Sequence, residues 1–302
     1  VISPLIFYFY IIILKKSYFL PADSFITQNR KPEINDSQAL MKLGDKPCVR
    51  VRRIFNINVT NCSETCLSVS WYARYGNHFV SFLSAIGVAR GIGMKKIVIY
   101  PNFLLFNKSF NFGEITVDIR NNITEKNCFH HNFYFIPNNM QPLVSQFIRN
   151  LTPEFQSMYM KKFPKSEVPD DALVIHVRGS NIFFKRPHFK YGQPPCKYYQ
   201  DVIRMKKWSK VILVAEDLKN PCIRTFIDKT EGFVNRTFRE DMSIILHAKN
   251  LVVSRSTLTN AMITISPNLK NLFTFNHSRF YDVNSMNCVP TDTYYKVVLK
   301  RW

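Results

Sequence analysis

The sequence predicts an α/β protein with two Rossmann-like domains that face each other across a cleft. Three observations lead to this prediction. Apolar runs typical of buried strands alternate with helical patterns in both halves of the chain, a polar Lys/Pro-rich stretch at 161–171 separates the halves, and 302 residues are enough for two domains. The hydrophobic content of 46% excludes a disordered or fibrous chain.

The first half contains a strand–helix–strand pattern. LSVSWY at 67–72 alternates and is rich in strand-forming residues, which predicts a strand. Apolar residues between 79 and 90 then follow helical spacing, and Gly91 and Gly93 are expected to end that helix. KKIVIY at 95–100 predicts the next strand, which Pro101 closes, whereas residues 102–165 show no regular pattern.

The second half repeats this alternation. Its apolar runs predict four strands, at 172–177, 210–215, 251–254 and 271–275. Helices are expected at 194–208, where prolines precede the helical pattern, and at 240–250. We therefore expect an N-terminal domain at 61–165 and a C-terminal domain at 166–302.

The N-terminal residues predict a secretory-pathway protein. The first 14 residues are apolar and uncharged, and Lys15 and Lys16 follow them. This stretch is short for a membrane span, which needs about 20 residues. Residues 1–20 therefore suit a signal peptide or signal anchor followed by a stem at 21–60, although a buried strand or helix is an alternative. We expect the protein to work in the lumen of the Golgi or endoplasmic reticulum, as a single-pass type II membrane protein or as a secreted protein. The N-terminal segment is the part expected to contact the membrane.

Sequons and cysteines agree with that compartment. Asn-x-Ser/Thr sequons begin at Asn35, Asn58, Asn61, Asn107, Asn122, Asn150, Asn235 and Asn276. The seven cysteines show no CxxC spacing, so disulfides are expected rather than a zinc or other metal site. Cys62 and Cys66 are close enough for a local bridge, and Cys48 lies nearby.

The charge balance favours an anionic small molecule over nucleic acid. Lys and Arg number 41 against 21 Asp and Glu, so the formal net charge is +20. The basic residues are spread along the chain without a run of five, so no nucleic-acid partner is expected.

Polar residues follow two of the expected strands and suit a phosphate group. Gly76 and Asn77 form a turn before a helix, where backbone N–H groups attract phosphate, although a plain structural turn is an alternative. His176, Arg178 and Gly179 end or follow the strand at 172–177. Arg178 is placed to clamp a diphosphate with both prongs of its guanidinium, and the alternative is an interdomain ion pair.

Two further strand ends carry similar residues. Glu216 and Asp217 follow the strand at 210–215 and can accept hydrogen bonds from a ribose or a guanine, although Asp217 also suits a helix N-cap. After 251–254 come hydroxyl groups, including those of Ser256 and Thr257, which predict either a phosphate-binding nest or an ordinary helix cap.

In order and spacing, these motifs resemble one family over about residues 66 to 275. ARYGNHFVSFLSAIGVARGIGMKKIVIYP, HVRGS and EDMSIILHAKNLVVSRST are similar to the first βαβ unit, the His-x-Arg strand end and the closing Asp–helix–strand–Ser segment of the fucosyltransferase-like superfamily. That superfamily contains the peptide O-, α1,2- and α1,6-fucosyltransferases.

The resemblance implies a GT-B-like fold and an inverting, metal-independent glycosyltransferase. Its nucleotide-sugar donor would be GDP-fucose, its acceptor a glycan or glycoprotein, and it would need no cofactor. Among the catalytic residues, Arg178 would contact the β-phosphate and Asn77 would face the sugar and phosphate. The remaining donor-binding residues would be Gly76, His176, Gly179, Ser180, Asn181, Glu216, Asp217, Asp241, Ser256 and Thr257.

One residue departs from the family pattern and leaves the general base open. Many relatives carry Asp where this chain has Asn181, and an amide cannot accept a proton as a carboxylate does. His78, His188, Glu216 and Asp217 are the alternatives, as is catalysis without a dedicated base. The departure also admits a catalytically silent glycan- or nucleotide-binding relative, and the fold admits a transferase that uses another nucleotide sugar.

Overall fold

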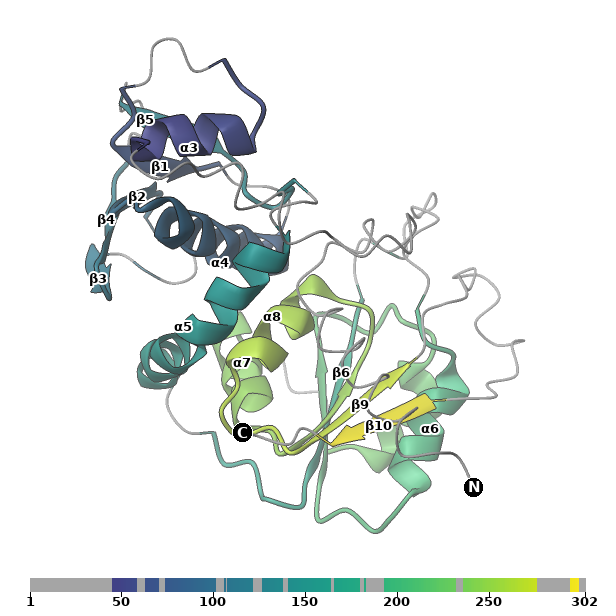
Figure 1. Ribbon diagram of the computed structural model, residues 1–302. Coiled ribbons are helices and arrows are strands. Elements are labelled where there is room, and N and C mark those ends of the chain that lie inside the picture. The colour runs from purple at the N-terminus through teal and green to yellow at the C-terminus, as the bar shows by residue number, and fades with distance from the viewer. Residues whose placement is uncertain are drawn as a thin grey trace, which may run out of the picture. The chain divides into compact units, whose positions relative to one another are not determined.

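A computed structural model describes residues 45–58, 63–70, 74–101, 106, 108–121, 127–137, 141–163, 166–179, 182, 193–231, 236–275 and 294–298. The chain divides into two compact units, Val1–Glu154 and Phe155–Trp302, and each is described by itself (Figure 1). Both units contain a mostly parallel sheet, which confirms an α/β protein and is consistent with two Rossmann-like domains.

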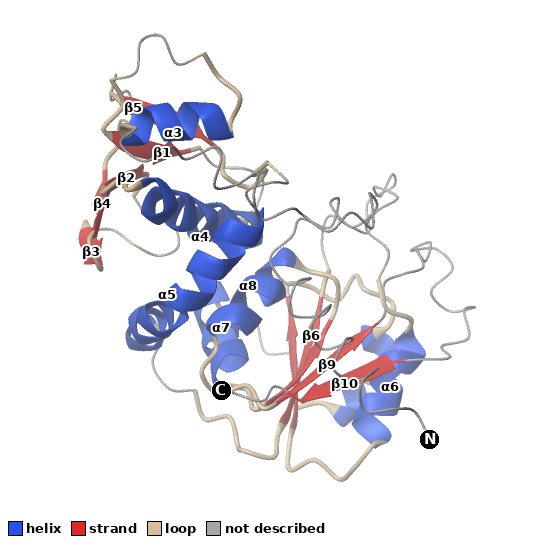
Figure 2. Ribbon diagram, viewed as in Figure 1, coloured by secondary structure: helices blue, strands red, loops and turns tan. Residues whose placement is uncertain are grey.

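The first unit contains a five-stranded sheet in the order β3-β4-β2-β1-β5. Strands β1, β2, β4 and β5 are parallel, and only β3 is antiparallel to its neighbour (Figure 2). The elements of this unit are α3 (Pro47–Ile54), β1 (Cys66–Val69), α4 (Tyr75–Ile92), β2 (Lys96–Ile99), β3 (Phe110–Phe112), β4 (Ile115–Ile119), β5 (Cys128–His131) and the first part of α5 (Gln141–Lys162).

Helix α4 connects β1 to β2 and packs on the sheet because it is apolar on nearly every side. Phe79, Phe82 and Ile86 are buried along it. The helix ends at Gly93, whose φ of 79° lies in the left-handed region that glycine adopts without strain. The prediction that Gly91 would help to end this helix is wrong, because α4 continues to Ile92.

Residues 102–165 contain more regular structure than the sequence indicated. Strands β3, β4 and β5 and helix α5 lie there. The predicted stem also contains a helix, α3, which buries Cys48, Val51 and Ile54 at helical spacing and contacts α4. The two units divide after Glu154, inside α5 and next to Pro153, whereas the expected boundary lies at 165.

The second unit contains a five-stranded sheet in the order β10-β9-β8-β6-β7. Its elements are β6 (Leu173–Val177), α6 (Cys196–Arg204), β7 (Val211–Ala215), the 3-10 turns η6 (Ile223–Thr225) and η7 (Ile227–Lys229), α7 (Phe238–His247), β8 (Asn250–Val253), α8 (Thr257–Ile265), β9 (Asn271–Phe275) and β10 (Tyr294–Val298). Strand β10 is antiparallel to β9, and the other four strands are parallel.

The strand order of the second unit is that of an open, doubly wound α/β sheet. Counted along the chain from β6, the order of the five strands from β7 to β10 is 2-1-3-4-5. Glu231 adds a single parallel bridge to Ile212 at the β7 edge. Helix α6 covers one face of the sheet, and α7 and α8 cover the other (Figure 2).

Disulfides lie in both units. Cys66 on β1 is bonded to Cys128 on the neighbouring β5, and Cys196 at the start of α6 is bonded to Cys222 before η6. Cys48 is disulfide-bonded as well. The expectation of disulfides is confirmed for these cysteines, but the local Cys62–Cys66 bridge is wrong, because β1 and β5 place Cys66 directly beside Cys128.

The disulfides indicate an extracellular or lumenal protein, since such bonds persist in oxidising compartments. Within the described ranges, every helix is too short or too polar to cross a bilayer. The apolar segment at 1–20 lies outside those ranges. Of the sequon asparagines, Asn58 is described with its side chain, and it is exposed.

Candidate functional site

The carboxyl edge of the second sheet gathers most of the sequence-predicted site residues. Arg178 follows β6, Glu216 follows β7 and Ser254 follows β8, and these three strands are parallel neighbours. The chain goes from β6 to β7 on one side and reaches β8 on the other side. The topological switch point of the sheet therefore lies between β6 and β8, where open α/β sheets bind their ligands.

Ser254 joins the ends of β6 and β8 at this switch point. The backbone N–H of Arg178 donates to Ser254 Oγ at 2.9 Å, and the N–H of Ser254 donates to the carbonyl of His176 at 3.1 Å. Ser254 Oγ also lies 3.1 Å from His176 Nδ1. These contacts fix the direction in which the chain leaves β6, and hence the position of Arg178.

His176 is buried and held neutral beside Arg178. Burial and the nearby Arg178 guanidinium, in that order, lower the pKa of His176 from 6.5 to about 3. A neutral His176 can hold the Ser254 hydroxyl but is no proton donor at neutral pH.

The depressed pKa of His176 predicts that acid weakens the fold. Between about pH 6.5 and pH 3 the unfolded chain binds a proton at His176 that the folded chain does not bind, so stability falls as the pH falls through this window. We expect this group alone to lower the free energy of unfolding by up to about 1.4 kcal/mol per pH unit between pH 6 and pH 4. Urea unfolding of the wild type and of His176→Asn at several pH values measures this pH dependence of the free energy of unfolding. Asn keeps a polar group near Ser254 without titrating, so equal pH slopes for the two proteins would contradict the assignment.

Asn220 ties the loop after β7 to the same edge. Its side-chain amide donates to the carbonyl of Arg178 at 3.0 Å, and its Oδ1 accepts from the N–H of Cys222 at 3.0 Å. Asn220 is fully buried, and Cys222 is anchored to α6 by its disulfide with Cys196. Sequence reasoning missed both Asn220 and the positioning role of Ser254, because these contacts span 42 and 76 residues of chain.

The side chain of Asp217 lies so close to Gly179 that a larger residue there would collide with it. A Cβ atom at position 179 would lie inside the contact distance of Asp217 Oδ1, 3.2 Å from Asp217 Cγ and 3.4 Å from the backbone oxygen of Asp217. Asp217 Oδ1 accepts from the N–H of Lys219 at 3.1 Å, and Lys219 Nζ lies 3.4 Å from Oδ2. Asp217 thus holds a turn and is not a helix N-cap, while Glu216 beside it is exposed.

We expect Gly179→Ala to destabilise the second unit by about 1–3 kcal/mol, the usual cost of an added methyl group without space. Asp217 would have to rotate away and lose its bond to Lys219. Asp217→Ala alone also loses the bond to Lys219, but it removes the obstructing carboxylate, so the double variant should lose clearly less stability than the sum of the two single variants. Urea unfolding of the two single variants and the double variant measures this coupling. If the two losses of unfolding free energy simply added in the double variant, the close contact between Gly179 and Asp217 would be unimportant for stability.

Ser256 and Thr257 stand where β8 turns into α8. Ser256 is the N-cap residue with extended backbone, and Thr257 opens the helix. The N-terminal end of α8 therefore follows the carboxyl end of β8, with its partial positive charge at the same edge as Arg178. The carbonyl of Ser256 accepts from Thr259 Oγ1 at 3.0 Å, which fixes the turn.

Asp241 lies in the first turn of α7, where it pairs with Arg236. Arg236 Nε donates to Asp241 Oδ1 at 3.0 Å, and another nitrogen of Arg236 donates to the carbonyl of Leu213 in β7. Burial raises the pKa of Asp241 despite this partner. The pair links α7 to β7, and this is the role that the observed contacts give Asp241.

Gly76, Asn77 and His78 belong to the first unit. Arg74 is the N-cap residue of α4, so Gly76 and Asn77 stand in the first turn of the helix. The prediction that they form a turn before the helix is wrong, because α4 already begins at Tyr75. Asn77 donates its N–H to the carbonyl of Arg74 at 2.9 Å, and its own carbonyl accepts from Ser81 Oγ at 2.9 Å. Gly76 is buried, and the other two residues are half-buried.

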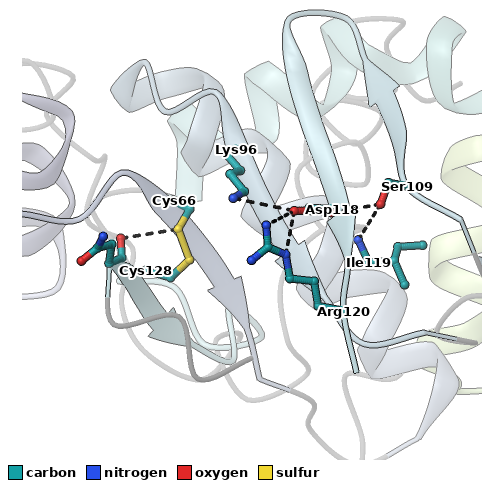
Figure 3. A network of polar contacts seen from close by, with 8 residues as sticks. Cys66, Lys96, Ser109, Asp118, Ile119, Arg120 and Cys128 are labelled. Atoms are coloured by element: carbon teal, nitrogen blue, oxygen red, sulfur yellow. Dashed lines mark hydrogen bonds and ion pairs between the residues drawn. A yellow bond between two sulfur atoms is a disulfide. The ribbon is translucent and has the colours of Figure 1, made fainter. Parts of the chain in front are cut away.

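A second polar cluster in the first unit centres on Asp118 of β4 (Figure 3). Asp118 accepts from Arg120 Nε at 2.8 Å and from Ser109 Oγ at 3.0 Å, and it lies 3.7 Å from Lys96 Nζ. Burial acts to raise its pKa, but these donors and cations leave it below the usual value. Asp118 is therefore a stable carboxylate that links β2, β4 and the residues before β3.

The remaining candidates lie outside the described residues: Ser180, Asn181 and His188. Within the described ranges, His, Cys, Asp and Glu side chains form no group of three that could hold a metal ion. Comparison with known proteins found no family model and no curated protein that matches this chain.

Proposed function

We propose that this protein is a glycosyltransferase that transfers fucose from GDP-fucose to a glycan or protein acceptor, with inversion at the anomeric carbon. The observation that carries the proposal is the place of Arg178 at the switch point of a mostly parallel, doubly wound sheet. Its backbone is held on both sides there, by Ser254 at the N–H and by Asn220 at the carbonyl. A nucleoside diphosphate suits this edge because Arg178 and the N-terminus of α8 both favour negative charge.

The chemistry follows from the charge that develops in the reaction. When the bond between the sugar and the β-phosphate breaks, negative charge grows on the departing diphosphate. A guanidinium fixed in position stabilises that charge more than it stabilises the bound donor, so it lowers the barrier. In this proposal Arg178 supplies the main stabilisation of the leaving group, and Ser256 and Thr257 add hydrogen bonds to phosphate oxygens.

Residues other than Arg178 would bind the nucleoside and act as the general base. Glu216 is exposed beyond β7, and in this proposal its carboxylate accepts from ribose hydroxyls or from a guanine. His176 is buried against Ser254, so its proposed role is to position Arg178 and not to act as the base. Glu216 and His78 remain candidate bases, whereas Asp217 is committed to the turn at Lys219.

We place the enzyme in the lumen of the Golgi or endoplasmic reticulum, either anchored through its N-terminal segment or secreted. The disulfides support an oxidising compartment, and the exposed sequon at Asn58 agrees with it. The net charge of +20 suits an anionic nucleotide sugar.

The proposal is tested by a screen of nucleotide sugars for nucleotide release. GDP-fucose, GDP-mannose, UDP-galactose and UDP-N-acetylglucosamine are each incubated with the full chain, with and without glycan and peptide acceptors and in the presence of EDTA. We expect acceptor-dependent release of GDP from GDP-fucose that EDTA leaves unchanged.

The other outcomes separate the alternatives. Binding of GDP-fucose without turnover would indicate a silent relative, in agreement with Asn181. Release from a different nucleotide sugar would indicate a transferase with another donor. Loss of activity in EDTA that Mn²⁺ restores would contradict the metal-independent mechanism.

A further inference from the structure

The exposed aromatic side chains of the described residues gather at one edge of the first sheet. Tyr75, Tyr100 and Phe135 have exposed fractions of 48%, 41% and 43%. They follow β1, β2 and β5 respectively. These three residues are the aromatic edge.

The topology brings the three chain segments together. Strands β2, β1 and β5 are adjacent and parallel, so their carboxyl ends meet at one edge. The N–H of Ser70 donates to the carbonyl of His131 at 2.8 Å, which places the ends of β1 and β5 side by side. Because β2 and β5 lie on opposite sides of β1, the switch point of this sheet lies between β1 and β5, and Tyr75 and Phe135 follow the two strands that flank it.

Local structure holds the aromatic residues at fixed positions. Asn132 Oδ1 accepts from the N–H of Tyr134 at 3.0 Å and from that of Phe135 at 3.4 Å, and His131 Nε2 lies 3.2 Å from the carbonyl of Phe135. Tyr75 opens α4 and packs edge-on against His78, with ring centroids 5.9 Å apart. The loss of conformational freedom on binding is therefore small.

A charged hydrogen-bonding pair lies at the same edge of the sheet. The N–H of Arg120 donates to the carbonyl of Ile99 at 3.0 Å, so the backbone of Arg120 lies next to the start of Tyr100. The Arg120 side chain is 42% exposed and is oriented by Asp118. Exposed aromatic residues at the same edge as an ordered guanidinium–carboxylate pair suit a sugar, which presents C–H groups on its faces and hydroxyls around its rim.

We propose that the aromatic edge binds the acceptor and that this acceptor is a glycan. This inference rests on the proposed function, in which the nucleotide belongs to the second unit and the first unit is left for the acceptor. Two strand spacings of about 4.8 Å separate β2 from β5, a span that suits at least a disaccharide. Each of the three residues is more than two-fifths exposed, which suits stacking of a sugar on an open surface and not a closed pocket for an apolar peptide side chain.

Saturation-transfer NMR of the full chain without donor tests the proposal. The probes are N-acetyllactosamine, chitotriose, a biantennary N-glycan and an unglycosylated Ser/Thr peptide. We expect at least one glycan to bind and the peptide not to bind. Tyr75→Ala, Tyr100→Ala and Phe135→Ala should each weaken glycan binding about fivefold to tenfold, the effect of losing one stacked ring.

Two controls make the result specific. Tyr100→Phe keeps the ring and should keep most of the binding, and Leu218→Ala, which removes an exposed apolar side chain from the second unit, should change nothing. GDP binding should be unchanged in all five variants, so a failure of donor binding and a failure of the aromatic edge are seen separately. Binding of the peptide alone, of no probe, or of glycan with undiminished affinity in the three alanine variants would overturn the proposal.

Discussion

Replacing Arg178 with alanine is expected to reduce turnover of GDP-fucose by about a hundredfold to a thousandfold, or about 3–4 kcal/mol of transition-state stabilisation. The residue follows the buried strand β6 and is half-buried at the switch point. Its backbone is held by Ser254 and Asn220, and neither of those hydrogen bonds depends on the side chain. The variant should therefore keep its fold while losing the positive charge that we propose stabilises the leaving diphosphate.

Arg178→Lys should also be severely impaired. Lysine keeps the positive charge but cannot make two parallel hydrogen bonds to a phosphate. Arg204→Ala is a matched control, because Arg204 is an exposed arginine of the same unit whose partner is Asp201 on α6. It should leave turnover unchanged.

Melting temperature and GDP release are measured on the same preparations. We expect a nearly unchanged melting temperature and a large loss of turnover for both Arg178 variants. An arginine whose role is an ion pair of the fold would behave in the opposite way, with a lower melting temperature and near-normal turnover in the protein that remains folded.

Removal of the Cys66–Cys128 disulfide is expected to cost the first unit about 4 kcal/mol, because the bond closes a loop of 62 residues that would otherwise be free in the unfolded chain. The two cysteines lie directly opposite each other on β1 and β5 and are buried. A loss of this size is a large fraction of the 5–15 kcal/mol that typically stabilises a domain. Urea unfolding of Cys66→Ala/Cys128→Ala measures it.

The neighbouring Val98 provides the control for packing. Val98 shares a buried cluster with the two cysteines, so Val98→Ala removes apolar contacts there without removing a cross-link. The disulfide variant should lose clearly more stability than Val98→Ala. Equal losses would mean that packing, and not the closed loop, accounts for the effect.

The sequence predicted those helices and strands whose own residues show a clear helical or strand pattern. The five residues of β6 are all apolar or buried, and the helix pattern of α4 is continuous, so both were found within a few residues of their observed bounds. Arg178 could be singled out because it directly follows such a strand. The phosphate-suited turn at Ser256 was visible for the same reason.

Other features depend on contacts between distant residues and could not be predicted. Strands β3 and β4 are short, with mixed apolar and polar residues, and α3 has only eight residues, so their patterns were weak. The pairing of Cys66 with Cys128 follows from the register of two strands, and the role of Asn220 follows from a hydrogen bond across 42 residues.

Calorimetric titration of GDP into the full chain and into Arg178→Ala tests most directly whether the carboxyl edge of the second sheet binds a nucleoside diphosphate. We expect GDP to bind the wild type with one site per chain and to bind Arg178→Ala, while that variant is still folded, at least tenfold more weakly, about 1.4 kcal/mol. Absence of GDP binding to the wild type, or equal affinity of the folded Arg178→Ala variant, would contradict it.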